Sequence, residues 1–255
     1  MNQLSVIIIT YNEEKNIERC LQSVQPIADE IIVVDSYSTD NTKRICEQYK
    51  VKFIEHAFEG YIEQKNFALQ QGSCEFALSL DADEAPDAEL LQAIISEKQK
   101  GFTADVYGMN RCNYFCGKWI KHGAWYPDRK IRLIKKGKGY WGGTNPHDKI
   151  IPAANTAVKK LNGDILHYTY HSLEELIAQQ NKFSTIAAQA MYQQGKQPSY
   201  FKLVLSPLVA FISSYIIKAG FLDKYEGYVI ARTMAYYTLF KYAKLIQLHR
   251  DAKKK

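Results

Sequence analysis

The sequence predicts an α/β protein with a mostly parallel sheet flanked by helices, followed by a C-terminal helical extension. Three apolar runs in the first ninety residues each end at an acidic or polar cluster, and helix-like segments separate the runs. Parallel strands buried on both faces consist of continuous Val, Ile and Leu, and their alternation with helices indicates a doubly wound sheet. Such a sheet binds its ligand at the carboxyl ends of its strands. The three clusters therefore predict one site.

Each element has its own local signal. Ile17, Leu21 and Val24 recur at the spacing of one helix face, and Pro26 ends that helix. The turn after Asp35 is rich in Ser, Thr, Asp and Asn, which cap helix starts. The expected order is a strand over 6–9, a helix over 12–25, a strand over 31–34, a helix carrying Ile45 and Tyr49, a strand over 52–55, a helix over 61–70, a strand over 76–80 and a helix over 87–98.

Composition limits the classes of function. The 255 residues are 46% hydrophobic and 24% charged, as expected for a folded domain, and the net charge of +6 favours an anionic partner. The five cysteines are odd in number and scattered, so they predict neither a redox pair nor a zinc site but a reduced, cytoplasmic chain. The apolar run over 6–9 is too short for a signal peptide.

The cluster after the third run has the chemistry of a metal site. Asp81 and Asp83 are separated by one residue, so a turn after the strand can present both carboxylates to one ion. Carboxylate oxygens suit Mg²⁺ or Mn²⁺, which bridge nucleotide phosphates. The alternative is a solvated acidic turn that caps the helix over 87–98.

Three motifs in the first ninety residues match a known family in order. They are VIIITYNEEKNI at 6–17, IIVVDSYSTDNT at 31–42 and LSLDADE at 78–84. They resemble glycosyltransferase family 2, whose members use nucleotide sugars and have a GT-A fold. Within this family the chain looks most like the lipopolysaccharide core β-glucosyltransferases, through QKN at 64–66, WYPDR at 125–129, RL at 132–133 and PHD at 146–148.

The resemblance implies roles for the matching positions. Arg132 could clamp a phosphate with its guanidinium, or it could be an ordinary charge on a strand face. The implied roles are the nucleoside pocket for Thr10, Tyr11 and Glu13, the base or ribose for Asp35, the donor phosphates or sugar for Lys65, the donor for Asp81 and the metal for Asp83.

An inverting transfer needs a base near the acceptor hydroxyl, and Asp128 and Asp148 are the candidates. Asp128 is preferred because its segment is rich in Trp, Tyr and Pro, which suits packing on a sugar. Many relatives have a Glu-Asp pair at this stage, where this chain has Pro127-Asp128. His147 is a candidate metal ligand, since some relatives have a metal-binding His late in this domain.

The last part of the chain has a different character. Residues 203–217 carry no charge, and Lys202 and Lys218 flank them. Fifteen residues are fewer than the roughly 20 needed to span a bilayer. Two interpretations remain open, a helix that lies in the membrane interface and a buried helical hairpin that closes the core with residues 228–248.

Together these observations predict a GT-A catalytic domain over 1–165 and a helical region over 166–255. The predicted function is metal-dependent, inverting transfer of a hexose from a nucleotide diphosphate sugar, first of all a UDP-sugar, to a lipid-linked saccharide of the lipopolysaccharide core or cell envelope. The expected place is the cytoplasm, on the inner face of the membrane. The alternatives are a protein or polysaccharide acceptor and a nucleotidyltransferase. No nucleic-acid partner is expected, because Lys and Arg are not concentrated on one motif in the first ninety residues.

Overall fold

The computed structural model describes residues 3–144 and 147–253, and of His147 only the backbone. The chain divides into two compact units. One unit consists of Met1–Arg111 and Asp128–Tyr168, and the other of Cys112–Pro127 and Thr169–Lys255. The division of the chain at residue 165 stays a prediction about its domains.

The first unit is built on a sheet with the order β3-β2-β1-β4-β8-β6-β11-β5 in the described residues. The strands β3, β2, β1 and β4 are mutually parallel, which confirms the predicted parallel sheet, and β8 pairs antiparallel with β4. The strands β9 and β10 pair antiparallel and form a separate β-ribbon. The strands are β1 Leu4–Thr10, β2 Glu30–Asp35, β3 Lys52–Glu55, β4 Phe76–Asp81, β5 Glu84–Pro86, β6 Val106–Phe115, β8 Asp128–Lys135, β9 Gly139–Thr144, β10 His147–Pro152 and β11 Val158–Tyr170.

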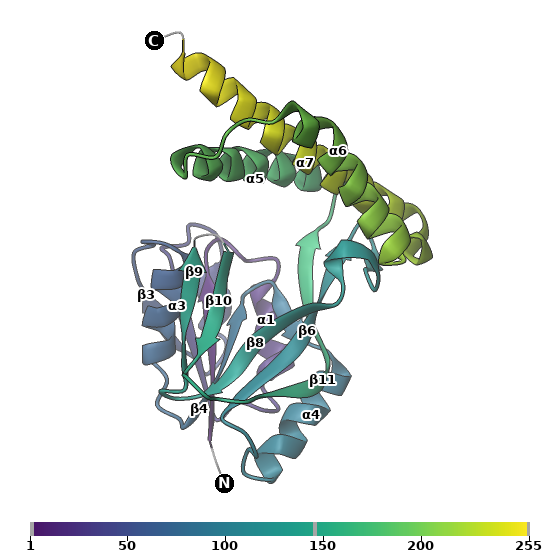
Figure 1. Ribbon diagram of the computed structural model, residues 1–255. Helices are drawn as coiled ribbons and strands as arrows, with labels where there is room; N and C mark the ends of the chain where they lie inside the picture. Colours follow the sequence, from purple (N-terminus) through teal and green to yellow (C-terminus); the bar gives the residue numbers. More distant parts are fainter. Residues whose placement is uncertain (1–2, 145–146, 254–255) are drawn as a thin grey trace. The chain divides into compact units, whose positions relative to one another are not determined.

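Helices cover both faces of this sheet (Figure 1). On one face Val6 and Ile8 pack with Leu21 of α1 and Ile94 of α4, and on the other face Ile7 packs with Ala68 of α3. Alternate residues of β1 thus lie on opposite faces, which explains why residues 6–9 are apolar without interruption. The helices are α1 Ile17–Val24, α2 Thr42–Cys46, α3 Tyr61–Gln70 and α4 Ala88–Gln99.

The second unit is helical. A capping box starts its first long helix, α5, with Ser172 and Glu175 bonding each other's backbone N–H groups. Both α5 and α6 pack along α7 (Figure 1). Its elements are β7 Lys118–Trp119, the 3₁₀ turn η1 Gly123–Trp125, α5 Leu173–Gln193, α6 Tyr200–Ile212, the π-turn η2 Ser213–Ile217, the 3₁₀ turn η3 Gly220–Asp223 and α7 Lys224–Ala252.

A buried carboxylate ties the inserted segment 112–127 to the helices of this unit. The Asp223 carboxylate accepts the backbone N–H groups of Lys121 and His122 at 3.1 and 2.8 Å. The Lys118 ammonium donates to the Asp223 carbonyl at 2.6 Å. The aromatic segment around Trp119 and Trp125 is therefore built into the helical unit.

The helix α6 is not the core-closing hairpin that was one of the two expectations. None of its residues is buried. Within the described residues, Tyr200–Ile217 is the stretch long and apolar enough, by length and composition, to cross a membrane, and only 6% of it is buried.

Candidate active site

The strand ends meet at one edge of the sheet, as the sequence predicts. Thr10 lies beside Asp35 in the register of β1 and β2, and Ile9 lies beside Asp81 in that of β1 and β4. Because β8 runs antiparallel to β4, its first residue, Asp128, lies toward the same edge. The polar residues after three strands thus come together although they are distant in sequence.

The loops after β1 and β2 are hydrogen-bonded to each other. The Asn12 N–H donates to Ser38 Oγ, and the Thr39 N–H donates to Asn12 Oδ1, both at 2.8 Å. This arrangement leaves the side chains of Tyr11 and Tyr37 each 57% exposed at the loop pair. Tyr11 is therefore no core aromatic, and its place at the edge is consistent with the predicted nucleoside contact, which stays a prediction.

Thr10 and Asp35 are both buried at this edge. The Asp35 carboxylate accepts the N–H of Ser38 at 2.7 Å and also its hydroxyl, so it shapes the loop after β2. The Thr10 hydroxyl is buried and has no hydrogen-bond partner. A buried polar atom of this kind costs free energy unless something bonds to it, which is consistent with a ligand contact here.

Three consecutive residues of α3 reach three different parts of the site. Gln64 Nε2 donates to Ser36 Oγ at 3.1 Å. Asn66 exchanges two hydrogen bonds with the backbone of Trp141. Between them, the buried Lys65 places its ammonium 4.4 Å from the centre of the Trp141 ring. The QKN motif therefore positions the Lys65 ammonium and holds the backbone of Trp141, whose ring faces that ammonium.

The Lys65 ammonium joins two of the predicted carboxylates. Its Nζ atom lies 3.0 Å from Asp81 Oδ1 and 2.8 Å from Asp148 Oδ2. Asp148 comes from β10, so the structure brings this late candidate to the donor residues. Burial alone would raise the pKa of Asp81, but the Lys65 ammonium and the Arg132 guanidinium hold that pKa well below its usual range.

Arg132 is also buried in this cluster, where its partner Glu84 was not predicted. Arg132 Nη2 lies 2.7 Å from Glu84 Oε1 and 3.3 Å from Asp81 Oδ2. Its Nε and Nη1 atoms are buried without a hydrogen-bond partner. A guanidinium with two unused donors is more than a plain strand-face charge, because those donors can bond phosphate or sugar oxygens.

Glu84 extends the cluster to Asp128 through a second arginine. Arg111 lies 3.5 Å from Glu84 Oε1 and 2.9 Å from Asp128 Oδ2. Lys130 Nζ lies 3.0 Å from the other carboxylate oxygen of Asp128. Both candidates for the base, Asp128 and Asp148, are thus linked by cations to the Asp81 cluster, at its opposite ends.

Asp83 has a partner that sequence reasoning missed. His167 of β11 places Nε2 3.1 Å from Asp83 Oδ2, and the Tyr168 N–H donates to the Asp83 carbonyl at 3.0 Å. Burial raises the pKa of the Glu13 carboxyl group, the hydrogen bond from Asn16 opposes this, and the charge of Asp83 adds to the rise. The predicted metal-binding carboxylate therefore contacts an imidazole.

These donors fit a divalent cation that shares its ligands with a substrate. Within the described residues no group of three or more His, Cys, Asp or Glu side chains forms a complete metal cage. Asp83 and His167 offer a carboxylate oxygen and an imidazole nitrogen, and Mg²⁺ and Mn²⁺ commonly add water and phosphate oxygens to so few protein ligands. The side chain of His147, the predicted second ligand, lies outside the described residues.

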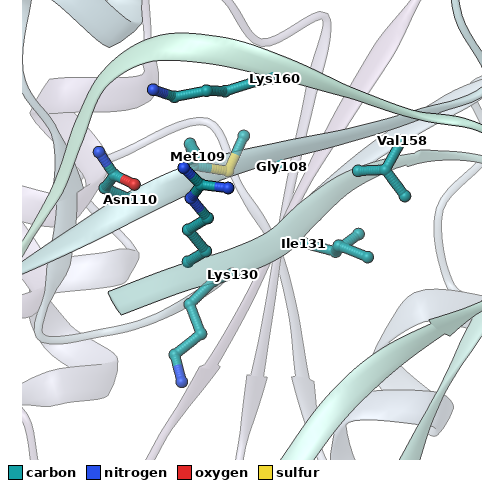
Figure 2. Close-up of a pocket in the computed structure, with 8 residues that line it drawn as sticks. Gly108, Met109, Asn110, Lys130, Ile131, Val158 and Lys160 are labelled. Atoms are coloured by element: carbon teal, nitrogen blue, oxygen red, sulfur yellow. The ribbon is translucent and has the colours of Figure 1, made fainter. Parts of the chain in front are cut away.

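A cavity of about 380 Å³ lies between β6, β8 and β11. Figure 2 shows Asn110 and Lys160 at one end of the cavity and Ile131 and Val158 at the other. The predicted donor and metal residues lie elsewhere. The cavity is lined by Gly108, Met109, Asn110, Arg129, Lys130, Ile131, Val158 and Lys160.

The family comparison agrees with this arrangement of strand ends and acids. The family described as "Glycosyl transferase family 2" matches residues 5–154, which contain the whole cluster of Asp81, Asp83 and Glu84. The chain belongs to glycosyltransferase family 2. It is therefore a glycosyltransferase, as its motifs predict.

Individual relatives support the narrower resemblance as well. The family 2 chain is 31% identical over 252 residues to the lipopolysaccharide core biosynthesis glycosyltransferase LpsC of Rhizobium meliloti, covering 96% of this chain and 93% of LpsC. It is 32% identical to an uncharacterised glycosyltransferase of Rickettsia typhi, covering 97% and 88% of the two chains. The predicted likeness to lipopolysaccharide core enzymes is confirmed.

A solved structure shares the fold of this family 2 enzyme. The mannosyltransferase PcManGT of Pyrobaculum calidifontis, solved in complex with GDP-Man and Mn²⁺, aligns with a TM-score of 0.56 at 16% identity. The alignment covers 96% of this chain and 87% of PcManGT. The predicted GT-A fold, with its sheet flanked by helices and its C-terminal helices, is confirmed.

Proposed function

We propose that this glycosyltransferase moves a hexose, with inversion, from a nucleotide diphosphate sugar to a lipid-linked saccharide of the lipopolysaccharide core or cell envelope. The observation that carries the proposal is the pairing of Asp83 with His167 at the strand edge, beside the buried cations Lys65 and Arg132. Such a site combines a place for a metal ion with donors for a diphosphate group. The donor nucleotide is proposed to be UDP first of all.

The residues at the strand ends would hold the donor. Tyr11, Glu13 and the loop shaped by Asp35 would contact the nucleoside, with the Thr10 hydroxyl as a further donor or acceptor. Lys65 and Arg132 would bond the phosphates or the sugar, because Arg132 Nε and Nη1 are buried without partners. Asp81 keeps both cations in place through its contacts with each of them.

A divalent metal fits between Asp83 and His167, and PcManGT, which shares the fold, was solved with Mn²⁺. When bound, the ion would neutralise the charge that develops on the diphosphate leaving group. Asp83 would supply a carboxylate oxygen, and His167 would supply Nε2 in its neutral form. His147 remains a proposed ligand on the strength of the family resemblance alone.

The transfer itself would be a single displacement. The acceptor oxygen forms its bond to the anomeric carbon while the bond from that carbon to the diphosphate oxygen breaks, and a carboxylate takes the acceptor proton. We favour Asp128 as this base. Its side chain is 28% exposed and open to an acceptor, whereas that of Asp148 is 11% exposed and lies against Lys65.

The acceptor is proposed to be lipid-linked, with the enzyme on the inner face of the cytoplasmic membrane. LpsC bears the name of a lipopolysaccharide core enzyme, and such saccharides are built on a lipid. If the C-terminal helices were buried, a protein or polysaccharide acceptor would be favoured. Instead, α6 has no buried residue.

The first experiment measures donor binding and hydrolysis with UDP-, GDP- and ADP-sugars, with Mn²⁺ and with a chelator. We expect one nucleotide to be released in a metal-dependent reaction that Asp83→Ala abolishes. Calorimetric Mn²⁺ binding in the presence of that nucleotide should weaken at least about tenfold in His167→Gln, since even indirect supports of a metal contribute that much. The exposed His171 offers a matched control, His171→Gln, which should bind Mn²⁺ as the wild type does.

Two outcomes would count against the proposal. If no nucleotide sugar binds, with or without metal, the proposal that the donor is a nucleotide diphosphate sugar is wrong. Unchanged Mn²⁺ affinity in His167→Gln would show that His167 is not a metal ligand. Its contact with Asp83 would then be structural.

A further inference from the structure

The second unit exposes many large apolar side chains, most of them on α6 and the turns that follow it. Phe201, Val209 and Ile217 are 73%, 63% and 75% exposed. Burial of apolar surface drives folding, and soluble proteins rarely expose a large contiguous apolar patch without a partner for it. We call this set the α6 surface, and it consists of Tyr200, Phe201, Val204, Leu205, Leu208, Val209, Ile212, Ile216, Ile217, Phe221, Leu222, Tyr225 and Tyr228.

Positive charge accompanies the α6 surface. The last sixty residues contain eleven Lys and Arg against three Asp and Glu, whereas the first 195 contain twenty-two against twenty-four. The whole positive balance of the chain thus lies in the part that contains α6 and α7. Lys202, Lys218 and Lys224 stand within or beside the apolar surface itself.

A helix that spans the bilayer does not fit these observations. The helix α6 packs lengthwise on α7, which carries Lys224, Glu226, Arg232 and Lys241. Charged side chains are costly inside the hydrocarbon layer, so the pair cannot enter it together. One apolar helix face with basic residues beside it is instead typical of helices that lie in the plane of the interface.

A second copy of the chain is a poorer occupant than a bilayer. A symmetric dimer through the α6 surface would bring the lysines of both copies into one interface, and the cores of protein interfaces are depleted in Lys. Anionic lipid headgroups would neutralise the same charges, while tyrosines such as Tyr200, Tyr225 and Tyr228 prefer the boundary between water and lipid.

We infer that the α6 surface binds the interface of an anionic phospholipid bilayer, with α6 parallel to the membrane plane. This inference rests on the proposed function for the lipid-linked acceptor and deepens it by naming the surface that would meet the lipid. The apolar side chains enter one leaflet, and the flanking lysines contact headgroup phosphates.

The test is sedimentation of the full chain with vesicles of phosphatidylethanolamine and phosphatidylglycerol, and with vesicles of phosphatidylcholine. We expect binding to the anionic vesicles that weakens with salt and is much weaker for phosphatidylcholine. Val209→Asp and Ile217→Asp should each reduce vesicle binding at least tenfold. Ile177→Asp replaces an exposed isoleucine of α5 outside the surface and should bind as the wild type does.

The inference is overturned if the wild type binds no vesicles or if both α6 variants, folded by circular dichroism, bind like Ile177→Asp. Equal binding to both vesicle types would contradict the preference for an anionic bilayer and the contact of the lysines with headgroup phosphates. A concentration-dependent dimer that Ile217→Asp abolishes would assign the surface to a second copy. Donor hydrolysis without vesicles tests the proposed function separately, since its failure leaves vesicle binding untouched.

Discussion

Asp128 and Asp148 lie at opposite ends of one chain of ion pairs, and this difference predicts different consequences for their removal. Asp128 contacts Arg111 and Lys130, outside the donor cations, whereas Asp148 contacts Lys65 directly. We expect Asp128→Asn to lower kcat by about 100-fold to 10,000-fold, the usual contribution of general base catalysis, with donor KM nearly unchanged. Steady-state kinetics with a saccharide acceptor would measure both constants.

Asp148→Asn serves as the matched comparison. Loss of its charge leaves the Lys65 ammonium with Asp81 as its carboxylate partner, so the variant should raise donor KM more than it lowers kcat. The opposite pattern, a large loss of kcat in Asp148→Asn and a small one in Asp128→Asn, would transfer the role of base to Asp148.

Residue roles could be predicted from the sequence only where a motif carries them. Asp81 and Asp83 follow a strongly apolar strand, so their position at the sheet edge was predictable. His167 and Glu84 were missed for a different reason. Their partners are set by the pairing of β11 with β5 and by the packing of two arginines, which depend on contacts between segments far apart in the chain.

At the scale of elements, a glycine on β11 allows close approach to the first turn of α4. Gly163 has a φ of +87°, and a Cβ atom at this position would lie 2.1 Å from the backbone nitrogen of Leu90. That nitrogen donates to Asp87, the N-cap of α4. Neither backbone can move without breaking the cap or the strand, so only glycine fits here.

We therefore expect Gly163→Ala to lower the free energy of unfolding by more than about 4 kcal/mol, beyond the usual range for one substitution. Gly137, with a φ of +79° and open space within 4 Å of where a Cβ atom would lie, provides the matched control. Gly137→Ala should cost only about 1–2 kcal/mol from the backbone conformation. Thermal unfolding would compare them, and equal losses would show that the approach to Leu90 relaxes.

The elements themselves were largely predictable, because buried parallel strands and amphipathic helices leave strong local patterns. The eight expected elements all occur, but two helices are shorter than expected: α1 begins at Ile17 instead of residue 12, and α2 ends at Cys46, so Tyr49 lies outside it. The short strand β5 over Glu84–Pro86 was not expected, since three residues give no periodicity and its pairing with β11 is a long-range contact. The exposure of α6 could not be predicted from the sequence either, because an apolar helix has the same pattern whether it is buried or faces a lipid.

At the scale of the whole molecule, the burial of several paired carboxylates predicts how stability depends on pH. Glu97 is the clearest case, since its carboxylate lies 2.8 Å from Lys159 Nζ and 2.8 Å from Thr103 Oγ1, and accepts the Tyr107 hydroxyl at 2.9 Å. It thereby joins α4, β6 and β11. Burial alone would raise the pKa of Glu97, but these three partners lower it to about 2.

A pKa that is lower in the folded state than in the unfolded state, where Glu titrates near about 4.3, stabilises the protein above that value. This contribution is lost as pH falls from about 4.3 toward 2, because the folded protein must then accept a proton that breaks the contacts of Glu97. We expect Glu97→Gln to be less stable than the wild type at pH 7 and to lose less stability on acidification. Urea unfolding at pH 7, 4 and 3 measures both effects, with the exposed Glu47→Gln as control. Parallel losses of stability in wild type and Glu97→Gln would show that other carboxylates, such as Asp81, dominate the acid limb.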